Sequence, residues 1–143
     1  MGLRRLLGTV ARWTPFVVAL PRRYVGRGDR WAAFDLDGWT AEYEWREDAW
    51  NGWLDCASHP DDTVAAATGD CEDYALVAAS WALARGRTPV GLGFCFRSWI
   101  PVPRHAVAYD RDRVYSSGDI REESLDEYLD RSEYTWALRR RLA

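Results

Sequence analysis

The stretch Gly69-Asp70-Cys71-Glu72-Asp73-Tyr74 decides the fold, because it places a cysteine in the predicted first turn of a long helix. Asp70 is a good N-cap, and Asp73 at the third helical position gives a weak form of a capping box. Gly86 supplies a stop signal and Pro89 prevents continuation. We therefore predict a helix over residues 71–85, with a face of small alanines that allows close packing on a sheet.

Cys71 is a candidate nucleophile because of its place at the start of this helix. Unpaired N–H groups and the positive end of the helix dipole stabilise a thiolate there. The alternative is a small buried apolar residue, which is the commoner role of a cysteine in a helix. Nearby carboxylates would raise the pKa of the thiol, so activation depends on the helix end and on a protonated histidine.

His105 and Asp119 are the candidate partners of the thiol. Residues 105–110 and 113–117 are predicted to form a hairpin around Arg111-Asp112. A two-residue turn pairs His105 with Gly118, and a three-residue turn pairs it with Asp119. Cross-strand neighbours lie about 5 Å apart, so a carboxylate in either register is expected to hold the imidazole. The alternative is a surface histidine and an unrelated turn aspartate.

The other segments give a coarse pattern of helices and strands. Residues 90–96 form an apolar run that predicts a strand, and residues 134–142 predict a final strand or helix. We expect helices near residues 1–13, 48–56, 60–67 and 122–128, and one or two strands or an irregular aromatic arm in residues 22–47. This pattern predicts an α+β fold in which the central helix carrying the cysteine packs on an antiparallel sheet.

Length and composition limit the class of protein. The chain has 143 residues, which predicts one domain, and a net charge of −3, which gives no reason to expect a nucleic-acid partner. Its three cysteines are Cys56, Cys71 and Cys95, and their spacing predicts neither a disulfide framework nor a zinc site. A free thiol suits a reducing compartment, so we expect a cytoplasmic protein.

The N-terminal segment is basic and apolar without matching a targeting signal. Arg12 interrupts the apolar run, and that run is too short to span a bilayer, so we expect neither a secretory signal nor a transmembrane segment. Leu3, Leu6 and Leu7 fit one helical face. Docking of that face on the protein's own core is the favoured interpretation, and weak membrane-surface contact through residues 1–20 is the alternative.

Gly69-Asp70-Cys71-Glu72-Asp73-Tyr74-Ala75, followed by His105-Ala106-Val107 and Gly118-Asp119, resembles the bacterial transglutaminase-like cysteine proteinases. Pro60-Asp61-Asp62-Thr63 is similar to the segment that leads into the cysteine in that family. The resemblance covers residues 58–120, which we expect to form the catalytic core. Residues 1–57 are then an N-terminal helix and aromatic arm, and residues 121–143 a C-terminal element of the same domain.

The resemblance implies a papain-like core with Cys71 as nucleophile, His105 as general base and acid, and Asp119 as the orienting carboxylate. It also implies an oxyanion hole from the Cys71 N–H and an upstream donor, for which Trp50, Asn51 and Trp53 are candidates. The family's flanking acidic residues take part in calcium binding. Here calcium through Asp70 and Glu72 is the lesser alternative to no cofactor, since an N-cap role explains Asp70.

These features predict a cysteine protease or amidase that acts on a protein or peptide through an acyl-enzyme. We favour hydrolysis because water is always present and no amine-binding feature is visible in the sequence. A transglutaminase-type acyl transferase is one alternative. A binding module that keeps the fold without turnover, and uses the aromatic residues of 31–53 as a partner surface, is the other.

Overall fold

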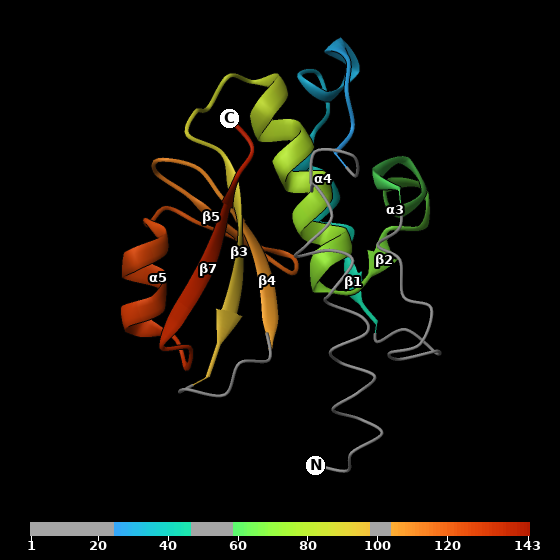
Figure 1. Ribbon diagram of the computed structural model, residues 1–143. Coiled ribbons are helices and arrows are strands. Elements are labelled where there is room, and N and C mark those ends of the chain that lie inside the picture. Colours follow the sequence, from blue (N-terminus) through green and yellow to red (C-terminus); the bar gives the residue numbers. More distant parts are fainter. Residues whose placement is uncertain (1–24, 47–58, 98–103) are drawn as a thin grey trace.

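The computed structural model describes residues 25–46, 59–97 and 104–143, and it has an α+β architecture built on a five-stranded sheet (Figure 1). Its elements are, in chain order, the 3-10 helix η2 (Asp29–Trp31), α2 (Leu36–Glu42), β1 (Glu44–Trp45), α3 (Pro60–Ala66), β2 (Thr68–Gly69), α4 (Cys71–Ala84), β3 (Gly91–Phe96), β4 (His105–Tyr109), β5 (Val114–Ser116), β6 (Asp119–Arg121), α5 (Leu125–Arg131) and β7 (Trp136–Arg141). The helices expected at residues 1–13 and 48–56 lie outside the described residues.

The main sheet is antiparallel throughout, with strand order β6-β5-β4-β3-β7. The three strands predicted from residue 90 onward are present, and the final segment is the strand β7 rather than a helix. Because β7 pairs along the whole of β3, the C-terminal element is an integral part of the sheet. A separate two-stranded parallel ladder joins β1 to β2, immediately before α4.

Each face of the sheet is covered by one helix, α4 on one side and α5 on the other (Figure 1). Strand side chains alternate between the two faces, which divides the core into two clusters. The α4 cluster takes from the sheet Leu92, Phe94, Phe96, Ala106, Ala108 and Tyr115. The α5 cluster consists of Cys95, Val107, Tyr109, Val114, Leu125 and Tyr128.

Helix α4 begins at Cys71, as the sequence predicts. Asp70 Oδ1 accepts a hydrogen bond from the Asp73 N–H, and Asp73 Oδ2 accepts one from the Asp70 N–H, so the capping box is complete. Every residue from Cys71 to Ala82 is buried. The sheet covers one side of the helix and α3 lies on the other side (Figure 1), while η2 also contacts α4 and α2 packs against both α4 and the edge strand β6.

Residues 22–47 differ from the expected strands or aromatic arm. The described part, residues 25–46, forms η2, α2 and the two-residue strand β1. Asp35 caps α2 by accepting a hydrogen bond from the Gly38 N–H, and the Trp39 ring stacks on Tyr74 of α4 with centroids 5.7 Å apart. The alternating aromatic residues resemble a strand pattern, but their packing against α4 favours a helical conformation here.

Helix α5 begins three residues later than the predicted helix at residues 122–128. Ser124 is its N-cap and forms a full capping box with Glu127. The cap, rather than the acidic run before it, fixes the start of the helix.

Candidate functional site

Cys71 is the first residue of α4, and its side chain is nearly covered. The residue is 7% exposed, and Sγ donates a hydrogen bond to Glu72 Oε2 at 3.3 Å. The Glu72 carboxylate is itself buried, with the residue 4% exposed. A thiol at a helix N-terminus beside a carboxylate is a polar arrangement, whereas Cys95 lies in the apolar α5 cluster, where burial raises the pKa of its thiol to about 12.

Aromatic side chains hold the start of α4 in place. Tyr43 Oη donates to the Asp70 carbonyl at 2.8 Å, and Thr40 Oγ1 and Tyr74 Oη lie 3.0 Å apart in a buried hydrogen bond. Burial raises the pKa of Tyr43 far above its ordinary value, and the negative charge of Asp73 adds to that effect. The hydroxyl of Tyr43 is thus a permanent donor that fixes the backbone next to Cys71.

His105 opens β4 and belongs by alternation to the face that α5 covers. Its Nε2 lies 2.7 Å from Ser116 Oγ on β5, and its ring stacks on Tyr134 with centroids 5.6 Å apart. Tyr134 in turn packs against the α5 cluster. The imidazole is therefore held on two sides by residues of the sheet and of the segment that leads into β7.

The imidazole of His105 is neutral at neutral pH. Burial lowers its pKa from 6.5 to about 4, and the negative charges of Glu72 and Glu133 oppose that effect only in part. Glu72 thus acts on both groups: it accepts the hydrogen bond of the thiol and contributes to the electrostatic field at the imidazole. The protonated histidine that was expected to activate Cys71 is therefore absent at neutral pH, and His105 can act only as a proton acceptor, with the weak basicity of a group whose pKa is near 4.

Cys71 and His105 do not share a hydrogen bond in the part of the chain that the structure describes. The thiol is bonded to Glu72, and Nε2 of His105 is bonded to Ser116. The second ring nitrogen, Nδ1, is not engaged by any of the described residues. Both groups lie near Tyr134 at the same end of the sheet, but on opposite faces of it, because Cys71 belongs to the α4 cluster and His105 to the face that α5 covers.

The pairing predicted for Asp119 with His105 is wrong. The hairpin adopts the two-residue register, with Ala108 opposite Tyr115 and Tyr109 opposite Val114, but β5 ends at Ser116. Ser117 and Gly118 have φ values of 38° and 87°, which are the positive values of a tight two-residue turn. The chain reverses there, so Asp119 lies on β6, on the far side of β5 from His105, and its carboxylate pairs with Arg121 at 2.6 Å.

Ser116 is the site residue that the sequence analysis missed. Continuing the β4–β5 register places Ser116 opposite Val107, so it is a diagonal neighbour of His105 on the same face. The available signal was the dipeptide Ser117-Gly118, which is typical of a turn and would have ended β5 at Ser116.

The other residues considered for the site have different placements. His59 is the N-cap of α3, where Nδ1 accepts from the Asp61 N–H. The oxyanion candidates Trp50, Asn51 and Trp53, and Cys56, lie outside the described residues. Residues 1–20, considered for membrane contact, also lie outside them, and within the described ranges no helix has the length and apolar character needed to cross a bilayer.

The two acidic side chains considered for calcium, Asp70 and Glu72, both take part in hydrogen bonds within the protein. Asp70 uses Oδ1 for the helix cap, and Glu72 accepts the thiol hydrogen bond. Among residues 25–46, 59–97 and 104–143, no three His, Cys, Asp or Glu side chains are grouped so that they could hold a metal ion.

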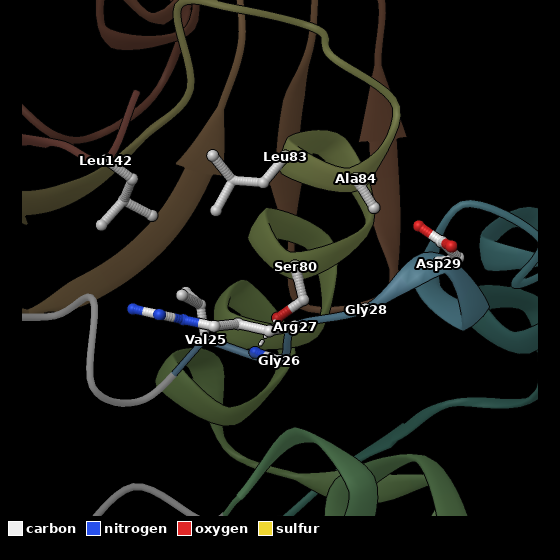
Figure 2. Close-up of a pocket in the computed structure, with 9 residues that line it drawn as sticks. All are labelled: Val25, Gly26, Arg27, Gly28, Asp29, Ser80, Leu83, Ala84 and Leu142. Carbon is white, nitrogen blue, oxygen red and sulfur yellow. Dashed lines mark hydrogen bonds between the residues drawn. The ribbon is translucent and has the colours of Figure 1, made fainter.

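A hollow of about 440 Å³ lies beside the second half of α4 and is separate from the candidate site (Figure 2). Ser80 lies on its wall, about 13 Å along the helix from Cys71. Its hydroxyl accepts from the Gly26 N–H at 2.7 Å and donates to the Leu76 carbonyl at 2.6 Å. The hydroxyl therefore ties residue 26 to α4, which is a structural role.

Comparisons of the chain with protein-family models, with curated proteins and with solved structures found no match in any of the three.

Proposed function

We propose that the protein is a cysteine-dependent hydrolase, a protease or amidase, with a transglutaminase-like core of the papain type. Cys71 is the nucleophile and His105 the general base. One observation carries the proposal: the thiol stands on the first residue of a buried helix and donates a hydrogen bond to a buried carboxylate, Glu72, whose charge also acts on the neutral, partly buried imidazole of His105. An inert core cysteine has no need of this polar surrounding.

In the proposed reaction, the neutral His105 accepts the proton of the Cys71 thiol, and the sulfur attacks the carbonyl carbon of an amide. The C=O π pair moves to oxygen, where the Cys71 N–H at the helix N-terminus is placed to stabilise the developing charge. The oxyanion then collapses, the C–N bond breaks, and the protonated imidazole returns its proton to the leaving amine. The product of this half is a thioester on Cys71 and a free amine.

Water completes the cycle. His105 takes a proton from water as the oxygen attacks the thioester, and the C–S bond breaks to release a carboxylic acid. The proton on the imidazole then returns to the thiolate of Cys71. Attack by an amine in place of water would give the transglutaminase alternative, and no feature of the described residues selects an amine.

The binding-module alternative is favoured by one specific observation, the coverage of Cys71. With 7% of the residue exposed, a substrate carbonyl reaches the sulfur only if neighbouring side chains move. On that alternative the aromatic rings of Trp39, Tyr43 and Tyr74 belong to a core that supports a partner surface, and Cys71 forms no acyl-enzyme.

Alkylation by iodoacetamide at pH 7, followed by peptide mapping, tests whether the thiol reacts. Cys95 is the control within the same chain, because its buried thiol is expected to remain unlabelled. We expect Cys71 to react faster than free cysteine and His105→Ala to slow that reaction by about tenfold or more. A Cys71 that reacts no faster than free cysteine, with His105→Ala unchanged from wild type, contradicts the catalytic assignment.

The reaction type is tested by incubating wild type and Cys71→Ala with a proteome and analysing the products by mass spectrometry. New N-termini that depend on Cys71 support hydrolysis. Isopeptide products without new N-termini support the transferase. The absence of both kinds of product supports the binding module.

A further inference from the structure

The hydrogen bond between His105 Nε2 and Ser116 Oγ is 2.7 Å long, shorter than the 3.3 Å hydrogen bond between Cys71 Sγ and Glu72 Oε2. Both side chains stand on paired strands, β4 and β5, so the sheet fixes their separation. Tyr134 stacks on the imidazole and restricts its rotation. Ser116 is thus in the place where a carboxylate was expected from Asp119.

We propose that Ser116 is the positioning residue of His105, and that it holds the tautomer with the proton on Nε2 so that Nδ1 is free to accept the proton of Cys71. The inference rests on the proposed function and goes beyond it, because it assigns the orienting role to a neutral hydroxyl. Asp119 lies opposite Ser116 on the next strand, β6, and its carboxylate pairs with Arg121, so the proposal assigns it no contact with the imidazole.

The hydrogen bond between His105 and Ser116 can form with either of two proton arrangements, and only one of them leaves His105 Nδ1 able to accept a proton. If Ser116 donates to Nε2, the ring proton lies on Nδ1, and the nitrogen needed for the thiol is blocked. If Nε2–H donates to Ser116 Oγ, Nδ1 carries the lone pair, and the Ser116 proton needs an acceptor of its own. Tyr128 Oη lies 3.5 Å from Ser116 Oγ and is the acceptor that the described residues provide.

The proton balance follows from this arrangement. The Cys71 proton moves to Nδ1, the proton on Nε2 stays in its bond to Ser116, and the imidazole becomes a cation. Ser116 offers that cation a dipole but no charge. Glu72 supplies the negative charge at this end of the sheet, since its carboxylate already acts on the imidazole.

The test is the tautomer of His105, read from the ¹⁵N chemical shifts of the ring nitrogens at pH 7. His59, the exposed N-cap of α3, provides a reference in the same spectrum that should not respond to changes at β5. Ser116→Ala removes the hydroxyl, and Ser116→Thr retains it. Ser117→Ala is the matched control, because Ser117 is the next residue and its buried hydroxyl has no hydrogen-bond partner within the described chain.

We expect wild type, Ser116→Thr and Ser117→Ala to carry the proton on Nε2, and Ser116→Ala to shift population toward Nδ1–H. Alkylation of Cys71 should slow by about tenfold in Ser116→Ala alone. A wild-type proton on Nδ1, or a Ser116→Ala spectrum identical to wild type, overturns the inference. If the tautomer behaves as expected but Cys71 is unreactive in every variant, the positioning role stands and the proposed function fails.

Discussion

At the scale of single residues, His105 makes the protein sensitive to acid. Burial holds its pKa near 4 in the folded chain against 6.5 in the unfolded chain, so the unfolded state binds more protons between these values. Stability is therefore complete above pH 6.5 and falls as the pH drops toward 4. We expect His105 to account for a loss of about 2 to 3 kcal/mol over that interval. Urea unfolding of wild type and His105→Gln at pH 7 and pH 4.5 measures it, and an unchanged difference between the two proteins at both pH values would contradict the prediction.

The carboxylates of Glu72 and Glu133 both raise the pKa of the His105 imidazole, and the effect of Glu72 is the larger of the two. A carboxylate favours the charged imidazole, so removing it lowers the imidazole pKa. We expect Glu72→Gln to move the NMR titration of His105 to lower pH by more than Glu133→Gln does. Glu133 is a suitable control because its side chain is 56% exposed and already pairs with Arg97. Equal shifts in the two variants would show that Glu72 has no special place beside the imidazole.

At the scale of elements, the cap of α4 sets the position of the candidate nucleophile. Asp70→Ala removes the acceptor for the Asp73 N–H, and we expect a loss of about 1 to 2 kcal/mol in the free energy of unfolding. Ser124→Ala is the matched change, because Ser124 caps α5 with the same two reciprocal bonds on the opposite face of the sheet. Both variants should lose stability in chemical denaturation, but only Asp70→Ala should alter the alkylation rate of Cys71. A changed alkylation rate in Ser124→Ala would mean that the reactivity follows global stability rather than the start of α4.

The elements that the sequence predicted well are those with local signals. Helix α4 carries its own cap at Asp70 and its own stop at Gly86, and the strands β3 and β4 are continuous apolar runs. The segment at residues 25–46 was predicted poorly because its aromatic side chains pack against α4. The sequence of the segment alone carries no information about that distant contact. The candidate site shows the same division. Cys71 and His105 could be selected by residue type alone. The contact of Ser116 with His105 depends on the turn at Ser117 and Gly118, which ends β5 at Ser116.

At the scale of the whole molecule, a buried ionic cluster joins the end of the β4–β5 hairpin to the segment that follows α4. Asp110, 4% exposed, accepts from Arg87 Nε and from Tyr115 Oη, both at 2.6 Å, and from the N–H groups of Asp112 and Arg113. These bonds outweigh burial and hold the pKa of the Asp110 carboxyl below its ordinary value. The cluster links the last turn before β3 to the strand that carries His105, so it ties α4 to the sheet at the end opposite the candidate site.

Neutralising Asp110 should therefore destabilise the entire domain while sparing the geometry around Cys71. We expect Asp110→Asn to cost about 3 kcal/mol, because it leaves the partly buried Arg87 without its counter-charge. Asp112→Asn, an exposed change in the same hairpin, should cost less than about 0.5 kcal/mol. Because the folded pKa of Asp110 is depressed, its contribution is present above pH 4 and is lost as the pH falls through the folded value. Thermal unfolding should thus show a smaller difference between the two variants at pH 3 than at pH 7. Equal losses in the free energy of unfolding for Asp110→Asn and Asp112→Asn at pH 7 would mean that the cluster does not hold the segment after α4 to the β4–β5 hairpin.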